Sequence, residues 1–313
     1  MRVFALNESS YLGKRIAKAM GIELSVLEHR DFSDGESKIR PMVSVRGQGV
    51  FVVQSLFSGP DLSPHDKLCR LLFLIATMRD HGAARVTAIV PYLTYARKDR
   101  RTKSHDPVTT RYIAQLFEAV QCDCVVTLEV HNVAAFQNAF RCQTVHLELE
   151  DVFQEKMAWR VDGEPLAVVS PDPGGVKRAQ LFREAIEDRL GQQVGFGFMN
   201  KRRSAGVMTS GEMVGDFEGA SVLIVDDMIA SGGTMLDAAL ECKRRGAAKV
   251  YALTAHGLFT GDPTALFSGE LIERVFITDS VEPHRLPDGE KTHRLEIAST
   301  AEILADTIKR LAL

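Results

Sequence analysis

Short, almost uninterrupted apolar runs alternate along the chain with longer segments of helical periodicity. The runs lie at residues 50–55, 85–93, 124–130, 165–171, 221–227, 249–255 and 274–278. A strand with one wetted face alternates apolar and polar residues, so continuous apolar runs predict parallel strands that are covered on both faces. Segments 66–83, 109–121, 175–191 and 234–247 carry apolar residues at helical spacing and would supply the covering layers. The sequence therefore predicts an α/β fold in which parallel sheets are flanked by helices.

The chain has 313 residues, which exceeds what a single hydrophobic core usually fills. A strand, a helix ending in "HGAARV" and another strand occur near residues 50–93, and a similar pattern containing "RRGAAKV" recurs near 221–255. We therefore expect two similar domains, residues 1–148 and 149–313. We allow that the last helix of the second domain packs on the first.

Composition and charge exclude several classes of protein. The formal net charge is -3 and the basic residues are spread along most of the chain, which argues against a nucleic-acid groove or a polybasic membrane anchor. No apolar run approaches the length that crosses a bilayer, and the first residues do not resemble a signal peptide. The five cysteines show no CxxC or zinc spacing, so we expect buried, reduced thiols in a cytoplasmic protein.

The stretch "VDDMIASGGT" (225–234) places two adjacent carboxylates, Asp226 and Asp227, between a predicted strand and a glycine-bearing turn. Backbone N–H groups of such a turn, together with the start of the helix that Thr234 opens, form a cradle for phosphate. Two carboxylates would repel a bare phosphate, but they accept hydrogen bonds from hydroxyl groups. The pattern favours a ligand with a phosphate at one end and vicinal hydroxyls nearby, such as ribose 5-phosphate, over a turn with an acidic N-cap pair.

Two other predicted strands end in polar residues. Asp172 follows the strand at 165–171 and precedes two glycines, where it could hold Mg²⁺ directly or through water. Turn chemistry in the Pro-Asp-Pro-Gly sequence explains the same residues equally well. Glu129 and His131 follow the strand at 124–130, although a lone histidine is more often structural than a ligand.

Basic residues gather in the segment "NKRRSAG" (200–206), which lacks apolar periodicity, and in "YARKDRRTKSHDP" (95–107). Such runs are usually solvated turns. In an enzyme that transfers phosphoryl groups, a basic loop that closes over the substrate would stabilise charge in the transition state. The chain contains neither a Walker A pattern nor GxGxxG, so these generic motifs do not indicate nucleotide binding.

Several segments taken together resemble ribose-phosphate diphosphokinase, also called phosphoribosyl pyrophosphate synthetase, and indicate a divergent member. The segments are "FSDGE" (32–36), "YARKD" (95–99), "VVSPDPGGVKRA" (168–179), "NKRRS" (200–204) and "GDFEGASVLIVDDMIASGGTM" (215–235). The resemblance covers nearly the whole chain in the family's order. The motif DDxxxSGGT alone would suit any type I phosphoribosyltransferase, whereas its combination with the other segments is far more specific.

The resemblance implies two phosphoribosyltransferase-like domains related by a pseudo-twofold axis, with ATP bound mostly by the first and ribose 5-phosphate by the second. It implies an adenine site to which a neighbouring subunit contributes, and hence self-association as a dimer or a larger assembly such as a hexamer. The implied ATP-binding residues are Phe32, Asp34, Glu36, Arg97 and Lys98. The implied ribose 5-phosphate-binding residues are Asp226, Asp227, Ala230, Ser231, Gly232, Gly233 and Thr234.

The implied reaction transfers the β,γ-diphosphoryl group of ATP to the 1-hydroxyl of ribose 5-phosphate and leaves AMP. Lys201 and Arg203 match the family's catalytic cations, and His131 and Asp172 match positions that bind the Mg²⁺–ATP complex. The implied cofactor is therefore Mg²⁺. No general base is evident, and none is required when the nucleophile is held in line and charge is stabilised.

The chain departs from the family at two of these places. Lys98 stands where a glutamine is common, and "EVHN" (129–132) stands where DLHA is common. The stretch after His131 helps to form the phosphate-activated, ADP-inhibited site of the commonest class, and the tail segment of that class is also missing. We therefore expect activity without free phosphate and little allosteric inhibition by ADP. Two alternatives stay open: a phosphoribosyltransferase, and a catalytically silent homologue that regulates a true synthetase.

Overall fold

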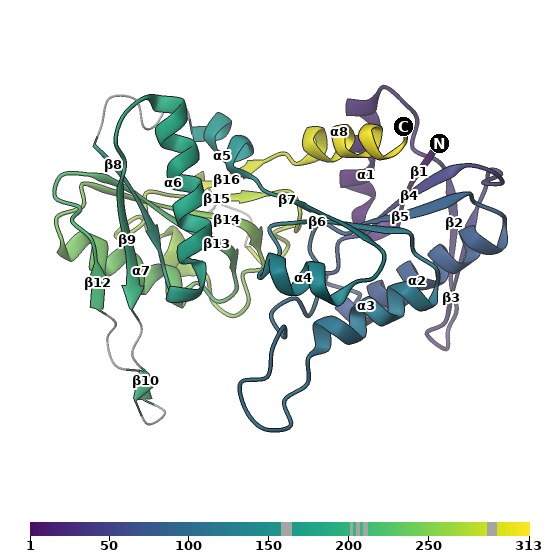
Figure 1. Ribbon diagram of the computed structural model, residues 1–313, viewed down its shortest axis with the longest axis horizontal. Helices are drawn as coiled ribbons and strands as arrows, with labels where there is room; N and C mark the ends of the chain where they lie inside the picture. Colours follow the sequence, from purple (N-terminus) through teal and green to yellow (C-terminus); the bar gives the residue numbers. More distant parts are fainter. Residues whose placement is uncertain (158–164, 201–202, 205–206, 209–211, 287–292) are drawn as a thin grey trace. The chain divides into compact units, whose positions relative to one another are not determined.

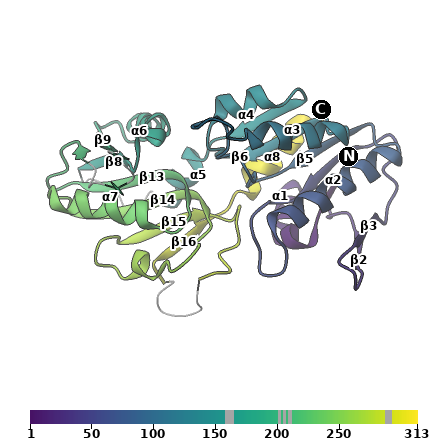
Figure 2. The same cartoon turned by 90° about the horizontal axis from the view of Figure 1, so that it is seen from below.

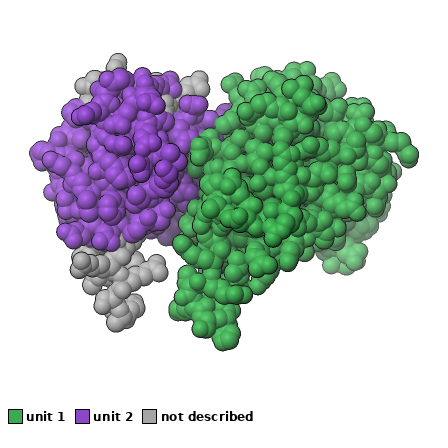
Figure 3. Space-filling model, in the orientation of Figure 1, with its two compact units in different colours: residues 1–148, 300–313 green, residues 149–299 purple. Residues whose placement is uncertain are grey.

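The computed structural model describes residues 1–157, 165–200, 203–204, 207–208, 212–286 and 293–313. Basic residues Lys201 and Arg202 therefore lie outside the described residues. The chain divides into two compact units, which Figure 3 colours separately: unit 1 contains residues 1–148 and 300–313, and unit 2 contains residues 149–299.

In the described chain, unit 1 is built on a five-stranded parallel sheet with the strand order β1-β4-β5-β6-β7. Its strands are β1 (Arg2–Ala5), β4 (Gly49–Val53), β5 (Arg85–Ile89), β6 (Cys124–Leu128) and β7 (Gln143–Leu147). A separate antiparallel hairpin is formed by β2 (Leu27–Asp31) and β3 (Ser37–Pro41). The helices are η1 (Asn7–Ser9), α1 (Ser10–Met20), α2 (Pro64–Asp80), α3 (Thr109–Ala119), α4 (Val133–Ala139) and α8 (Ala301–Leu311).

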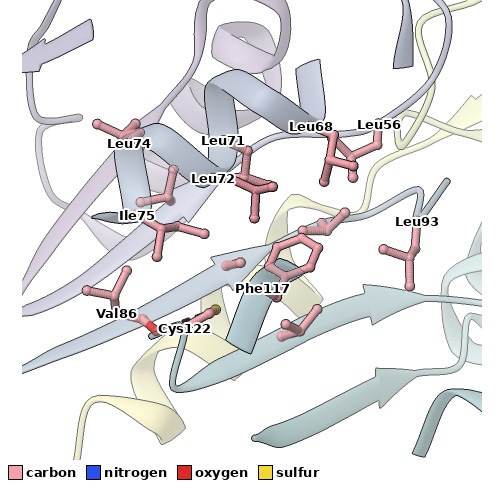
Figure 4. Close-up of a cluster of buried hydrophobic side chains, with 14 of the residues drawn as sticks. Leu56, Leu68, Leu71, Leu72, Leu74, Ile75, Val86, Leu93, Phe117 and Cys122 are labelled. Carbon is pink, nitrogen blue, oxygen red and sulfur yellow. Dashed lines mark hydrogen bonds between the residues drawn. The ribbon is translucent and has the colours of Figure 1, made fainter. Parts of the chain in front are cut away.

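Helices cover both faces of this sheet (Figure 1). Leu71, Ile75 and Phe117 from α2 and α3 belong to one apolar cluster with strand residues such as Val86, which Figure 4 shows in close-up. Helices α1 and α8 lie together over the other face (Figure 1). Burial of apolar side chains on both faces is the main stabilising contribution to such a sheet, and it explains why its strands are continuously apolar.

In the described chain, unit 2 contains a seven-stranded sheet with the order β12-β9-β8-β13-β14-β15-β16, parallel except for the edge strand β12. Its strands are β8 (Leu166–Ser170), β9 (Gly195–Asn200), β12 (Glu212–Val214), β13 (Ser221–Ile229), β14 (Lys249–Gly257), β15 (Arg274–Thr278) and β16 (Leu295–Ala298). Two short strands, β10 (Arg203–Ser204) and β11 (Val207–Met208), pair with each other. The helices are α5 (Glu150–Met157), η2 (Pro173–Gly175), α6 (Val176–Leu190), α7 (Gly233–Arg244) and η3 (Thr264–Phe267).

Helices α6 and α7 cover opposite faces of this sheet, as Figure 2 shows. The face under α7 is a continuous core that contains Met235 and Ala239 of the helix together with Val222 and Ile224 of β13. Both helices begin near the carboxyl ends of the parallel strands β8 and β13. Open parallel sheets bind their ligands beyond this edge.

The seven predicted strands are all present, and so are the four predicted helices. The strand predicted at 85–93 is four residues shorter than expected, because β5 ends at Ile89, shortly before Pro91. The strand predicted at 221–227 is longer than expected, because β13 stays paired with β14 as far as Ile229. The predicted α/β fold with helix-flanked parallel sheets is thus confirmed.

The expectation of buried cysteines is wrong at Cys69 and only partly met at Cys142. Cys122, Cys124 and Cys242 are buried, Cys142 is partly buried, and Cys69 is exposed. Burial raises the pKa of Cys122 and of Cys242 to about 12. Cys69 lies on α2 between core-facing leucines and points away from the sheet, which its spacing from Leu68 and Leu72 allows.

Candidate active site

Asp226 and Asp227 lie side by side within the last part of β13. The sequence places them at the end of a strand, but the strand continues past them because β14 is equally long, with Asp226 opposite Thr254 and Ile229 opposite Gly257. On the other side, the pairing of β13 with β8 ends at Ile224. The two carboxylates therefore emerge where one neighbouring strand has already stopped.

Asp226 and Asp227 are joined by a hydrogen bond. The backbone N–H of Asp227 donates a hydrogen bond of 2.9 Å to Oδ1 of Asp226. Only 16% of the Asp226 side chain and 4% of the Asp227 side chain are exposed. Burial, followed by the charge of Asp227, raises the pKa of Asp226 well above the ordinary range of a carboxyl group, whereas Arg178 acts in the opposite direction. A ligand that donates hydrogen bonds to the charged form would relieve part of this cost.

The turn after β13 has the geometry of an anion cradle. Gly232 has a φ of 89° and precedes α7, which begins at Gly233. The backbone N–H groups at the start of a helix lack intrahelical partners and carry partial positive charge. Ser231 and Gly233 are exposed, whereas Ala230 and Thr234 are partly buried. The residues predicted to bind the 5-phosphate, Ala230 to Thr234, thus form one turn at a helix N-terminus.

Asp172 lies in the neighbouring strand-to-helix connection. Its Oδ1 accepts hydrogen bonds from the N–H groups of Gly174 and Gly175, at 2.8 and 3.0 Å. A Cβ placed on Gly175 would lie 3.9 Å from Oδ1 of Asp172 and 3.8 Å from Oδ1 of Asp226. The structure therefore brings Asp172 and Asp226 to the same glycine.

Arg178 is a member of this group that the motif-based interpretation missed. It lies in the first turn of α6, and its Nη1 is 3.6 Å from Oδ1 of Asp226 and 3.8 Å from Oδ1 of Asp227. Only 16% of its side chain is exposed. The available signal was a pair of basic residues, Lys177 and Arg178, in the first turn of a helix, where the helix dipole disfavours positive charge.

In unit 1, the residues matched to the adenine site lie in the loop of the β2–β3 hairpin. Phe32, Asp34 and Glu36 are all exposed. The loop is closed by a hydrogen bond from the N–H of Phe32 to the carbonyl of Glu36, at 2.9 Å, and the N–H of Glu36 donates to Oδ1 of Asp34. The guanidinium of Arg30 lies 5.1 Å from the centre of the Phe32 ring. The hairpin thus presents an aromatic ring and two carboxylates at an exposed tip.

Arg97 and Lys98 follow a sharp turn after β5, and both are exposed. Tyr95 adopts a φ of 63°, a left-handed conformation that is uncommon for a residue other than glycine, and its carbonyl accepts a hydrogen bond from the N–H of Lys98. Glu129, which follows β6, also has a positive φ of 38°. Such strained residues cluster at ligand sites.

A side-chain contact joins the segments that carry Lys98 and His131. Nδ2 of Asn132 donates a 2.7 Å hydrogen bond to Oδ2 of Asp99, and Oδ1 of Asn132 accepts from the N–H of Ala135 at the start of α4. The same residue therefore caps α4 and fixes the loop that contains Arg97 and Lys98. Asn132 is a further residue that the motif-based interpretation did not select.

The structure describes only part of the basic segment that contains the expected catalytic residues Lys201 and Arg203. Lys201 lies outside the described residues, and Arg203 is described only through its backbone in β10. Within the described part of the chain, no three His, Cys, Asp or Glu side chains form a group that could hold a metal ion by themselves. Mg²⁺ is usually held by one or two carboxylates together with substrate phosphates and water, so Asp172 fits such a site without a closed set of protein ligands.

No helix among the described residues is both long enough and apolar enough to cross a lipid bilayer.

Both ends of the chain match families of known proteins. Residues 1–120 match the N-terminal domain of ribose phosphate pyrophosphokinase, and residues 208–312 match the phosphoribosyl synthetase-associated domain.

Full-length relatives and a solved structure agree with these matches. Ribose-phosphate pyrophosphokinase from Clostridium perfringens is 34% identical, with 99% of this chain and 94% of the relative covered. The protein of the same name from Caldanaerobacter subterraneus is 32% identical, with the same coverage. The crystal structure of phosphoribosylpyrophosphate synthetase from Mycobacterium smegmatis superposes with a TM-score of 0.86 at 28% identity, covering 99% of this chain and 98% of that one. With the fold, the paired aspartates and these full-length matches in agreement, the chain belongs to the ribose-phosphate pyrophosphokinase family.

Proposed function

We propose that this enzyme transfers the β,γ-diphosphoryl group of ATP to the 1-hydroxyl of ribose 5-phosphate, giving phosphoribosyl pyrophosphate and AMP. The observation that carries the proposal is the pair Asp226 and Asp227 beside the cradle at the start of α7. This combination suits a sugar phosphate because the turn receives the phosphate and the carboxylates accept hydrogen bonds from the ribose hydroxyls. Membership of the ribose-phosphate pyrophosphokinase family supports the same assignment.

The acceptor substrate would be fixed at both ends. The N–H groups of the turn formed by Ala230, Ser231, Gly232, Gly233 and Thr234 would bind the 5-phosphate. Asp226 and Asp227 would accept hydrogen bonds from the 2- and 3-hydroxyls. Fixing the sugar in this way presents its 1-hydroxyl oxygen to the β-phosphorus and removes much of the entropic part of the barrier.

The donor would be bound by residues of unit 1. Phe32 would stack on adenine, while Asp34 and Glu36 would accept hydrogen bonds from its amino group. Arg97 and Lys98 would bind the phosphates, since both are exposed cations on a loop that Asn132 fixes through Asp99.

Catalysis would then rest on charge stabilisation. The 1-hydroxyl oxygen forms a bond to the β-phosphorus and loses its proton to water, while the bond from that phosphorus to the oxygen bridging it to the α-phosphorus breaks. Negative charge therefore builds on the leaving oxygen of AMP. Lys201 and Arg203 would stabilise this charge and that of the transferring oxygens. His131 and Asp172 would hold Mg²⁺, which neutralises charge on the phosphates when it is bound.

We further propose that the chain self-associates. Val26 and Met42 lie next to each other at the open end of the β2–β3 hairpin and are 61% and 50% exposed, and Phe32 in the loop at its other end is 40% exposed. Large apolar side chains that are exposed close together commonly mark an interaction surface. Light scattering coupled to size-exclusion chromatography should give a mass of at least two chains. A mass of one chain at micromolar concentration would contradict self-association.

The test of the activity is phosphorus NMR of the protein with Mg²⁺, ATP and ribose 5-phosphate in the absence of free phosphate. We expect resonances of phosphoribosyl pyrophosphate and of AMP to grow together in equal amounts. ADP in place of AMP would indicate transfer of a single phosphoryl group. A complete lack of turnover, even after phosphate is added, would refute the proposed activity.

A Lys201→Ala variant tests the proposed division of roles. We expect turnover to fall by about a thousandfold or more, because transition-state charge loses a positioned cation, while ribose 5-phosphate binds nearly as in the unmodified enzyme. Calorimetric titration measures the binding and the NMR assay measures the turnover. An equal loss of both would show that Lys201 acts in binding or structure.

A further inference from the structure

Arg178 is a positive side chain that lies close to both aspartates of the candidate ribose site. Its Nη1 lies 3.6 Å from Oδ1 of Asp226 and 3.8 Å from Oδ1 of Asp227. It comes from a different element, the first turn of α6, and reaches the end of β13. One guanidinium group therefore lies near two adjacent carboxylates of another element, the strand β13.

The position of Arg178 in its helix is unfavourable in itself. The first turn of α6 contains no acidic residue, although the partial positive charge of a helix N-terminus favours acids there. Lys177 next to it is exposed to solvent, but Arg178 is largely buried. Burying a guanidinium at the positive end of a helix is costly unless carboxylates compensate it, and Asp226 and Asp227 do so.

The distances from Arg178 to the two aspartates show how its charge acts on them. Hydrogen bonds between N–H donors and oxygen are usually 2.7–3.2 Å long. Both contacts of Arg178 with the aspartates are longer than that, so they act through electrostatic attraction. Arg178 therefore offsets part of the repulsion between the two carboxylates, and ligand hydroxyls that donate hydrogen bonds to them would offset more.

We propose that Arg178 is a positioning residue that holds Asp226 and Asp227 together as charged acceptors for two vicinal hydroxyl groups of the acceptor sugar. This inference rests on the proposed function, in which that sugar is ribose 5-phosphate. Without the guanidinium, two buried carboxylates in contact would repel each other, and one would turn away or take up a proton. Either change removes an acceptor from the sugar and leaves the ATP-binding residues of unit 1 untouched.

The test compares Arg178→Gln, Arg178→Lys and the matched control Lys177→Gln, which removes the same charge from the same helical turn. For Arg178→Gln we expect the KM for ribose 5-phosphate to rise by about tenfold or more, with the KM for ATP changed less than about twofold. Arg178→Lys should recover a large part of the affinity, since it restores the charge without the planar fork. Lys177→Gln should behave as the unmodified enzyme.

Two further measurements keep the result interpretable. Calorimetric titration of each folded variant with ribose 5-phosphate alone measures acceptor binding without relying on turnover, and circular dichroism establishes folding. If the unmodified chain binds ribose 5-phosphate but makes no phosphoribosyl pyrophosphate, the proposed activity fails while the role of Arg178 is still tested by titration. The inference is overturned if Arg178→Gln binds ribose 5-phosphate normally. It is also overturned if both KM values rise alike with no recovery in Arg178→Lys.

Discussion

At the scale of single residues, the negative charge of the Asp226 carboxylate destabilises the ligand-free protein. The pKa of Asp226 is raised because the carboxyl group is buried and lies against Asp227. In the unfolded chain the same group titrates near the ordinary value for aspartate. A carboxyl whose pKa is raised by folding therefore reduces stability at every pH above its unfolded pKa, and the reduction disappears as the pH falls below that value.

Replacing Asp226 with Asn should accordingly stabilise the ligand-free protein. We expect a gain of about 1–2 kcal/mol near pH 8 that shrinks toward zero near pH 4, because the neutral amide avoids the repulsion of Asp227. Ribose 5-phosphate binding should weaken in the same variant. Urea unfolding followed at several pH values measures the gain, and a variant less stable than the parent at pH 8 would contradict this account.

His29 on β2 provides the opposite pH dependence. Its pKa is lowered mainly by burial and also by the charge of Arg70, whereas the charges of Glu8 and Asp31 raise it. A histidine whose pKa is lowered by folding contributes stability above its unfolded pKa of about 6.5, and this is lost as the pH falls through the folded value.

A His29→Phe variant should therefore lose less stability than the parent protein between pH 7 and pH 5. The ring volume is retained, while the proton uptake that favours unfolding is removed. Thermal unfolding in a series of buffers over this range gives the comparison. Parallel curves for the two proteins would show that His29 does not titrate differently in the folded state.

Motif recognition selected the aspartate pair and the glycine-bearing turn together, because both lie within one short stretch of sequence. It did not select Arg178 or Asn132. Their contacts join segments that are far apart in sequence, and a basic pair in a helix or an asparagine after a strand usually has a solvated or capping role. The assigned substrate roles themselves remain predictions.

At the scale of elements, the start of α7 depends on a glycine that other residues cannot replace. Gly232 has a φ of 89°, and a Cβ there would lie 2.6 Å from Cδ1 of Leu266. At Gly233, the next residue, a Cβ would meet no atom within 4 Å. The two glycines of one motif thus have different physical requirements.

Gly232→Ala should destabilise the protein by about 1–3 kcal/mol, because the added methyl group clashes with Leu266 in an unfavourable backbone conformation. Gly233→Ala is the matched control and should leave stability unchanged or slightly improved, since alanine is the better helix former. Chemical denaturation of both variants decides between them. Equal destabilisation of the two would contradict the steric explanation.

The sequence predicted the central strands well because a strand covered on both faces must be apolar throughout. It missed the edge strands β1, β7, β12 and β16, the strand β9 next to β12, and the β2–β3 hairpin. These elements are short or alternate with polar residues, and their pairing depends on partners distant in the chain. Periodicity within a window contains no information about such partners.

At the scale of the whole molecule, unit 1 is discontinuous. Residues 1–148 require α8, from the far end of the chain, to cover α1. Leu304 and Ile308 of α8 are fully buried, whereas Glu302 is exposed.

Leu304→Ala should cost unit 1 about 2–5 kcal/mol through the lost burial and the remaining cavity. Hydrogen exchange read by mass spectrometry should show faster exchange in α1 and little change in the central strands of unit 2. Glu302→Ala on the same helix is the control and should have little effect. Faster exchange confined to unit 2 would contradict the assignment of α8.

Because α8 belongs to unit 1 but follows unit 2 in the sequence, unit 1 is completed after unit 2 during synthesis. Unit 2 is continuous from residue 149 to 299, so all of it leaves the ribosome before α8 appears. At the usual speed of translation, residues 149–299 take roughly 8–30 s to make. During that interval Leu12 and Ile16 of α1, which are fully buried in the finished protein, lack their partner helix. The first unit to be translated is therefore the last to be completed, and a nascent chain stalled before residue 300 would present an apolar stripe on α1 to chaperones.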